Sequence, residues 1–176
     1  RRAAHEGGEL IPLTEGQVVG LYSEVCSSGA VDLIDYELSN PPEHLRYLKT
    51  LAQQHQLALV VSYHNFQQTP SCEAIVQTLL DAEAAGADIA KVAVMPQGLE
   101  DVLTLLSATL EANQKLTVPV VTMSMGAYGS LSRVFGGAFG SAVTFAVGQA
   151  SSAPGQMAVE EVNTVLDIVR RQLDNR

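Results

Sequence analysis

The sequence is poor in cysteine and has no long apolar segment, and each absence excludes a class of protein. Its 176 residues include two cysteines, Cys26 and Cys72, whose spacing fits neither a disulfide framework nor a CxxC metal motif. We interpret both as reduced residues that pack in the interior. No run of about 18 apolar residues occurs, and the first residues lack the apolar core of a signal peptide. The sequence therefore predicts a cytoplasmic protein with no membrane partner.

Positive charge is also scarce. The chain carries 10 Lys and Arg against 19 Asp and Glu, a formal net charge of −9 at pH 7. A nucleic-acid interface needs basic residues concentrated on one face, and no such cluster occurs. With 47% hydrophobic and 16% charged residues, the composition is typical of a globular protein rather than of a disordered chain. We expect one folded domain, residues 1–176, that does not bind nucleic acid.

Short runs of apolar, often β-branched residues alternate with longer stretches whose apolar residues have helical spacing. The expected strands cover residues 30–37, 57–63, 89–95, 118–123 and 141–146. Helices are expected from residue 15, over 43–54, 71–85 and 99–113, and at the C-terminal end. Strands joined by crossovers of this length form parallel βα units.

Two architectures fit this alternation, an open doubly wound sheet and a (β/α) barrel. No GxGxxG or GxxxxGK[ST] motif follows the first strand, which disfavours a nucleotide-binding open sheet. Polar residues instead follow the carboxyl ends of several strands, among them Asp35, Glu37, Ser62 and His64. That distribution resembles the top face of a TIM barrel, where the βα loops build the site.

Lys91 is the most informative single residue. Strand alternation places its ammonium group in the middle of an apolar strand, on the same face as Ile89, Ala93 and Met95. One interpretation is an edge strand or a side chain that extends its charged end to water. The other is an amine kept neutral by desolvation, and therefore a nucleophile of the Schiff-base type.

His64 ends the preceding strand and suits the second interpretation of Lys91. A histidine in this position is often a structural, hydrogen-bonded residue. Beside a Schiff-base lysine, however, it supplies the acid or base that moves a proton next to the iminium. The carboxylate that orients it can be Glu6, Asp35 or Glu37, and spacing alone does not choose among them.

Two later segments carry candidate ligand-binding groups. Arg133 follows a glycine-bearing turn near the start of a short helix, where its guanidinium either clamps a carboxylate or is simply solvated. The loop 151–156 is rich in turn-forming residues and offers two hydroxyls and an amide that can cover a ligand.

Taken together, these motifs resemble those of type I 3-dehydroquinate dehydratase, a Schiff-base enzyme of the shikimate pathway and of aromatic amino acid biosynthesis. The resemblance spans nearly the whole chain in family order. Its most specific parts are the lysine strand followed by Met-Pro-Gln and the Ser-Ala-Pro-Gly-Gln loop. The matching stretches are residues 5–9, 62–66, 90–97, 122–126 with 132–133, 139–145 and 152–156.

The resemblance implies a lyase and assigns catalytic and substrate-binding roles to particular residues of this chain. Lys91 forms an iminium with the ring ketone of 3-dehydroquinate, and His64, oriented by Glu6, removes the neighbouring proton and helps the hydroxyl to leave. The product of this syn loss of water is 3-dehydroshikimate. The residues expected to contact substrate are Arg2, Met123, Met125, Arg133, Phe145, Ser152 and Gln156. No metal and no organic cofactor are implied, since the iminium is itself the electron sink.

The same resemblance implies an incomplete (β/α)8 TIM barrel, which would need about 250 residues. We expect an N-terminally truncated chain with about five full strands and the end of a sixth. The first two βα units and most of strand three would be missing. Open strand edges favour pairing with a second copy, so a homodimer with doubtful activity is expected. The alternatives are another class I Schiff-base, aldolase-like enzyme and a non-catalytic fragment that acts as an assembly module.

Overall fold

A computed structural model describes residues 4–9, 11–149 and 155–173 of the chain. The N-terminal elements are η1 (Ala4–Glu6), α1 (Glu15–Ser27), β1 (Leu33–Glu37), α2 (Pro42–Gln54), β2 (Ala58–Asn65) and α3 (Cys72–Ala84). The remaining elements are β3 (Ile89–Val94), α4 (Leu99–Lys115), β4 (Val120–Ser124), α5 (Ser130–Phe135), η2 (Gly136–Phe139) and α6 (Val159–Leu173). Within these described ranges, no helix is long and apolar enough to cross a membrane.

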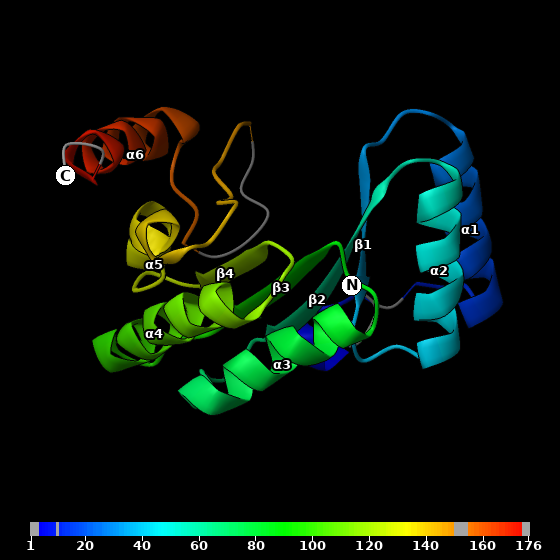
Figure 1. Ribbon diagram of the computed structural model, residues 1–176, viewed down its shortest axis with the longest axis horizontal. Helices are drawn as coiled ribbons and strands as arrows, with labels where there is room; N and C mark the ends of the chain where they lie inside the picture. The colour runs from blue at the N-terminus through cyan, green and yellow to red at the C-terminus, as the bar shows by residue number, and fades with distance from the viewer. Residues whose placement is uncertain (1–3, 10, 150–154, 174–176) are drawn as a thin grey trace.

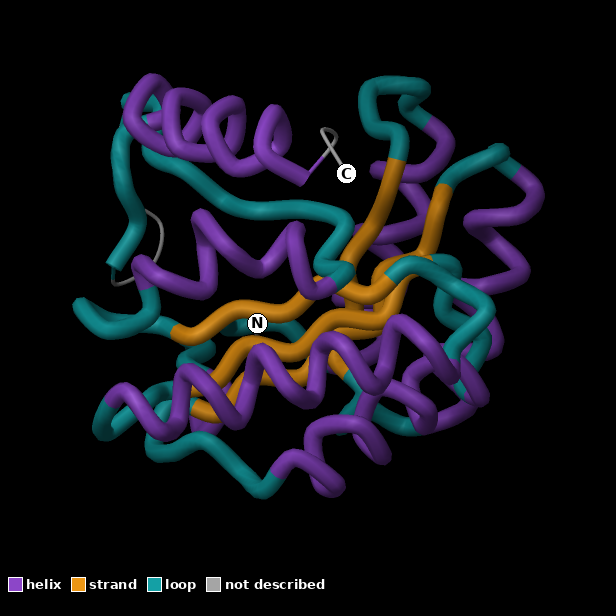
Figure 2. The backbone as a smooth tube through the Cα atoms, turned by 60° about the vertical axis from the view of Figure 1, so that its left-hand side comes forward, coloured by secondary structure: helices purple, strands orange, loops and turns teal. Residues whose placement is uncertain are grey.

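The strands form one parallel sheet in the order β1-β2-β3-β4. Each strand is joined to the next by a helix, which confirms the predicted βα units. Helices α3 and α4 run along one side of the sheet, whereas α1 and α2 lie together beyond β1 (Figures 1 and 2). On the opposite side, α5 and α6 lie beyond β4. The chain has the architecture of a partial barrel.

The helices begin where the sequence places their start signals. The side-chain oxygen of Thr14 accepts a hydrogen bond from the backbone N–H of Gln17, whose side chain accepts one from the backbone N–H of Thr14. This reciprocal capping box satisfies two N–H groups at the start of α1. The Ser71 hydroxyl caps α3 in a similar way, and Pro42 occupies the first turn of α2.

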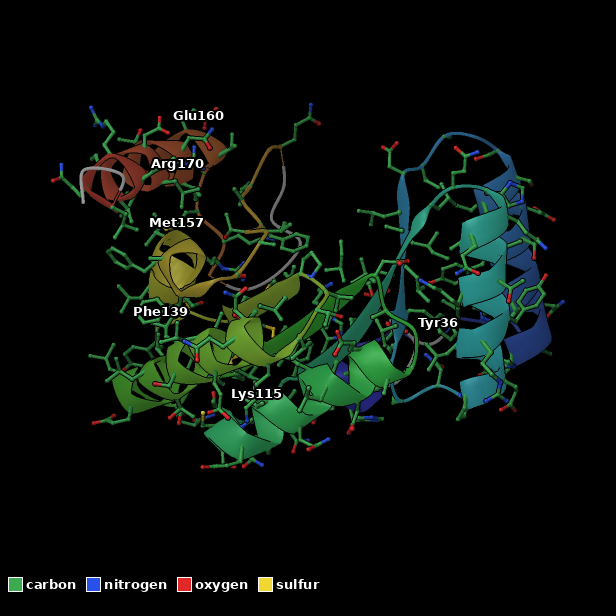
Figure 3. All side chains as sticks on the ribbon, in the orientation of Figure 1. Tyr36, Lys115, Phe139, Met157, Glu160 and Arg170 are labelled. Atoms are coloured by element: carbon green, nitrogen blue, oxygen red, sulfur yellow. The ribbon has the colours of Figure 1, made fainter. Side chains whose placement is uncertain are left out.

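The two faces of the sheet differ in composition. The helix-covered face packs into a large core that includes Leu48, Leu59, Leu79 and Leu105, all fully buried. Tyr36 of β1 belongs to this core and bonds through its hydroxyl to His44 of α2 at 3.2 Å (Figure 3). The other face carries a much smaller apolar cluster of Ala93, Val121, Met123 and Met125.

The prediction of a fifth strand over residues 141–146 is wrong, because these residues form no strand. Ser141 makes a single isolated bridge to Val120, and the Ala142 N–H donates to the Val120 carbonyl at 2.8 Å. The Thr122 N–H then donates to the Ser141 hydroxyl at 3.1 Å instead of to a strand carbonyl. The side chain takes the place of a backbone ladder partner, and the chain leaves the sheet.

The expected end of a sixth strand falls at the start of the chain. Residues 1–3 lie outside the described part of the chain, and Ala4–Glu6 form one turn of 3-10 helix. The described residues therefore contain four strands of the sheet, and the predicted strand over residues 141–146 is not among them.

Candidate active site

Register brings polar side chains from three strands to one face of the sheet. Lys91 of β3 is paired with Ser62 of β2, and His64 lies two residues beyond Ser62. Asp35 of β1 is paired with Val60, which shares its β2 face with Ser62 and His64. Because all these strands are parallel, the polar groups gather toward the carboxyl ends of neighbouring strands, as the sequence predicted.

His64 is held by a carboxylate from outside the sheet. Its ring Nδ1 lies 3.2 Å from Glu6 Oε2, and its backbone N–H donates to the same oxygen at 3.0 Å. Both side chains are buried. Of the three carboxylates left open by the sequence, Glu6 is therefore the one beside the ring. With Nδ1–H donating to Glu6, the neutral ring presents Nε2 as a proton acceptor.

The Glu6 carboxylate is itself strongly hydrogen-bonded. Ser39, in the turn after β1, donates its hydroxyl to Glu6 Oε1 at 2.5 Å. Burial on its own raises the pKa of Glu6, but the hydrogen bonds from the His64 side chain, Ser39 and the His64 backbone outweigh it. The pKa of Glu6 consequently lies below its ordinary value, and the group is an anion near neutral pH.

Lys91 is also paired, which corrects the expectation of purely apolar surroundings. Its Nζ donates to Asp35 Oδ2 at 2.6 Å, and the Ser62 hydroxyl donates to Asp35 Oδ1 at 2.5 Å. The Lys91 side chain is 13% exposed and Asp35 34%. Lys91 therefore has a counter-ion two strands away, across β2.

Phe145 closes one side of the Lys91 amine. The ring centroid of Phe145 lies 5.3 Å from Nζ, within the range of a cation–π contact. Phe145 belongs to the segment that was predicted as a strand, and its ring is partly exposed. The structure thus places Phe145 beside Lys91 although the strand predicted to carry Phe145 does not form.

Arg133 lies beneath this segment and is almost completely buried. Its Nη1 donates to the Phe145 carbonyl at 3.3 Å and lies 3.9 Å from the Met123 sulfur. Burial lowers the pKa of the guanidinium from its ordinary value. The interpretation of Arg133 as a solvated helix residue is wrong, because 1% of it is exposed.

The remaining predicted contact residues are only partly described. Met123 and Met125 are buried on the same face as Lys91 and form part of the small apolar cluster. Gln156 follows Gly155, whose backbone packs so closely on Gly126 that an added Cβ would lie 1.9 Å from the Gly126 carbonyl oxygen. This contact places the described end of the 151–156 loop beside Gly126, the residue after Met125. Arg2 and Ser152 lie outside the described residues.

Two partners in this arrangement were missed from the sequence. Asp35 was considered only as a partner for His64, and Ser39 was not singled out at all. The signal for Asp35 was its position on an expected interior face of β1, a strand that β2 separates from the lysine strand. Ser39 lies in a turn, and no sequence pattern marks it. Among the described residues, no group of three or more His, Cys, Asp or Glu side chains could hold a metal ion.

Comparisons with known proteins identify the family of this chain. The family model of type I 3-dehydroquinase matches residues 1–172. The 3-dehydroquinate dehydratase of Aromatoleum aromaticum is 58% identical over 173 residues, which are 98% of this chain and 66% of that protein. The enzyme of the same name from Geobacillus thermodenitrificans is 53% identical over 170 residues, 97% of this chain and 66% of the relative. The chain therefore spans slightly under two thirds of the length of these curated relatives.

Solved structures give the same result for the fold. The crystal structure of 3-dehydroquinate dehydratase from Geobacillus kaustophilus matches with a TM-score of 0.93 at 49% identity, covering 97% of this chain and 66% of that one. The type I enzyme from Clostridium difficile, described with covalently modified comenic acid, matches with a TM-score of 0.91 at 39% identity, covering 98% and 68%. The chain belongs to the type I 3-dehydroquinase family.

Proposed function

We propose that this chain carries the Schiff-base chemistry of 3-dehydroquinate dehydration, with Lys91 as the nucleophile and His64 as the acid and base. The observation that carries the proposal is the placement of two paired groups on one sheet face. Lys91 Nζ lies 2.6 Å from Asp35, and His64 Nδ1 lies 3.2 Å from Glu6. An amine and an imidazole on adjacent strands suit the attack on a ketone and the proton transfer beside it.

The expected reaction has three parts: iminium formation, loss of the hydroxyl and hydrolysis. The Lys91 amine adds to the ring ketone of 3-dehydroquinate, and loss of the carbonyl oxygen as water leaves a protonated iminium. His64 Nε2 then takes a proton from the adjacent carbon, and the iminium accepts the electron pair as an enamine. The enamine expels the hydroxyl on the next carbon, to which His64 returns its proton. Hydrolysis of the iminium releases 3-dehydroshikimate and restores Lys91.

The other residues would hold the substrate in place. Arg133 would bind the substrate carboxylate, since a guanidinium presents two parallel N–H donors to a carboxylate. Phe145, Met123 and Met125 would form apolar walls near Lys91, in keeping with their positions on the same face. Arg2, Ser152 and Gln156 are proposed as further contacts from the sequence resemblance.

Borohydride trapping tests this proposal. Reduction of an iminium with borohydride converts it to a stable secondary amine, so intact mass spectrometry detects one covalently bound substrate per chain. We expect trapping with 3-dehydroquinate and none in the variant Lys91→Ala. Trapping only with a sugar phosphate would favour an aldolase-like enzyme, and no trapping with either would favour a non-catalytic fragment.

The partner and location expected from the sequence are proposals as well. A homodimer would cover open edges of the four-stranded sheet, and sedimentation velocity on the purified chain measures its mass directly. A stable monomer with high turnover would contradict the homodimer. We retain the cytoplasm as the proposed location and residues 1–176 as one incomplete barrel domain.

A further inference from the structure

All three lysines of the chain are paired with a carboxylate at the same distance, yet their settings differ. Lys49 Nζ lies 2.6 Å from Asp88, and Lys115 Nζ lies 2.6 Å from Glu111. The Lys115 pair joins residues four apart on α4, and both of its side chains are substantially exposed. Ion pairs of that kind on a surface contribute little to stability. The Lys91 pair is different because it joins two strands on the interior face and excludes more water from the amine.

Asp35 is fixed in a way that suits a role at the amine. One of its carboxylate oxygens accepts from the Ser62 hydroxyl, and the other accepts from Lys91 Nζ. Ser62 is buried and lies on β2, directly between the strands of Asp35 and Lys91. A carboxylate held at both oxygens keeps its orientation when the amine reacts, which preserves the geometry for proton transfer.

We infer that Asp35 takes a proton from the Lys91 ammonium before the amine attacks the substrate ketone, and that Ser62 positions Asp35 for this step. The inference deepens the proposed function and rests on it for the identity of the ketone. An ammonium has no lone pair, so the 2.6 Å pair in its charged form cannot attack a carbonyl until a proton has left. Asp35 is a proton acceptor already in contact with the reacting atom.

The proton balance closes without any further reagent. An ammonium and a ketone yield a protonated iminium and one water, so two of the three protons on Nζ leave with the carbonyl oxygen. The first moves to Asp35 Oδ2 and frees the lone pair that bonds to the carbonyl carbon. The second passes from nitrogen to oxygen in the carbinolamine. Asp35 then returns its proton to the carbinolamine hydroxyl, which departs as water while the C=N bond forms.

The deciding variant is Asp35→Asn, which keeps the shape of the side chain but cannot accept the proton. Its matched control is Asp88→Asn, which removes the carboxylate from the Lys49 pair. We expect Asp35→Asn to slow borohydride trapping of 3-dehydroquinate on Lys91 at pH 7 at least tenfold, and Asp88→Asn to leave it unchanged. General acid–base groups typically contribute a factor of about 100 or more. The trapping rate of Asp35→Asn should also rise more steeply between pH 6 and 9, as hydroxide replaces the missing base.

A second readout separates this inference from the proposed function. Reductive methylation with formaldehyde and cyanoborohydride, followed by peptide mass spectrometry, reports the reactivity of each lysine amine without any substrate. Asp35→Asn should lower methylation of Lys91 at pH 7 severalfold, because formaldehyde is also a carbonyl compound that only the deprotonated amine attacks, and should leave methylation of Lys115 unchanged. If the unmodified chain is not trapped by 3-dehydroquinate, the proposed function fails, and methylation alone decides whether Asp35 controls the amine.

Two results would overturn the inference. One is an Asp35→Asn variant that is trapped at the unmodified rate with the same pH profile. The other is unchanged methylation of Lys91 in that variant. If Asp35→Asn does not fold by circular dichroism, Ser62→Ala takes its place, since it leaves the ion pair intact and removes only the bond that positions Asp35. We expect Ser62→Ala to slow trapping severalfold, and an unchanged rate would contradict the positioning role.

Discussion

Strands β1 to β3 and the segment that follows β4 hold their proposed functional side chains in different ways. On the side of β1, β2 and β3, each proposed reactive group is bonded to a carboxylate from another element: His64 to Glu6 and Lys91 to Asp35. Beyond β4, the described residues 140–149 and 155–158 make two isolated bridges and no strand. The reactive groups are therefore fixed by hydrogen bonds, whereas Phe145, one of the proposed substrate walls, lies in a segment that forms no strand.

Helix α6 belongs to the looser side. It begins with the acidic residues Glu160 and Glu161 and ends with the basic residues Arg170 and Arg171, a distribution that favours the helix dipole. Of its described side chains, however, only Val162 is fully buried. Glu160 and Arg170 mark this outer helix in Figure 3. The helix therefore has favourable charges at both ends but contributes little to the core.

The largest expected effect is on chemistry and comes from His64→Ala. Removal of the imidazole should lower dehydration turnover by a factor of about 100 to 10,000, the usual contribution of a general acid or base. The matched control is His55→Ala, which alters an exposed histidine at the end of α2. Product formation from 3-dehydroquinate, followed spectroscopically, measures both. Equal turnover in the two variants would show that His64 is not the general acid or base of the reaction.

The next effect contrasts the core with the outer helix. Leu79→Ala removes a fully buried side chain between α3 and the sheet and should lower the free energy of unfolding by about 2–5 kcal/mol. Ile168→Ala removes a side chain of α6 that is 48% exposed and should cost less than about 0.5 kcal/mol. Urea unfolding measures both changes. Similar losses would show that α6 is as tightly packed as the core.

Glu6→Gln tests the carboxylate that holds His64. It keeps the shape of the side chain but removes the charge, and it should lower the free energy of unfolding by about 1–3 kcal/mol at pH 7. Because the pKa of Glu6 is lowered on folding, its stabilisation is complete above the ordinary value of 4.5 and is lost as pH falls through the lower folded value. The difference in unfolding free energy between the unmodified chain and Glu6→Gln, measured by urea unfolding, should therefore become smaller as the pH is lowered. A free-energy difference that does not depend on pH would contradict a stabilising role for the ionised Glu6 carboxylate.

The smallest effect is local to α1. Thr14→Ala removes the side-chain acceptor of the capping box and should cost about 1 kcal/mol of unfolding free energy. Thr14→Ser retains the hydroxyl and is the control. Thermal unfolding should rank the unmodified chain and Thr14→Ser above Thr14→Ala. No difference between the two variants would mean that the capping bonds contribute nothing measurable.

Local signals predicted much of this fold. The starts of four helices were predicted within one residue from Thr14, the proline pair before α2, Thr69-Pro70 before α3 and Gly98, because start signals act within one turn. The strand at 141–146 failed because an apolar pattern does not reveal whether a neighbouring strand offers a complete ladder of partners. Strand formation depends on distant pairing, and here the Thr122 N–H donates to the Ser141 hydroxyl.

The candidate site divides in the same way. Lys91 was predicted because a charged residue in the middle of an apolar strand is unusual, and His64 because it ends the preceding strand and suits a Schiff-base lysine. Their partners were harder to assign, since Glu6 is 58 residues from His64 and Asp35 is 56 residues from Lys91. Only the parallel register of β1, β2 and β3 shows that Asp35 faces the lysine rather than the histidine.

The most direct test of the account is to locate the trapped substrate among the three lysines. The protein is reduced with borohydride in the presence of 3-dehydroquinate, digested and sequenced by tandem mass spectrometry. The account predicts a single adduct on Lys91, with Lys49 and Lys115 unmodified although each has a carboxylate partner at 2.6 Å. An adduct spread over all three lysines, or found on Lys49 or Lys115 alone, would contradict it.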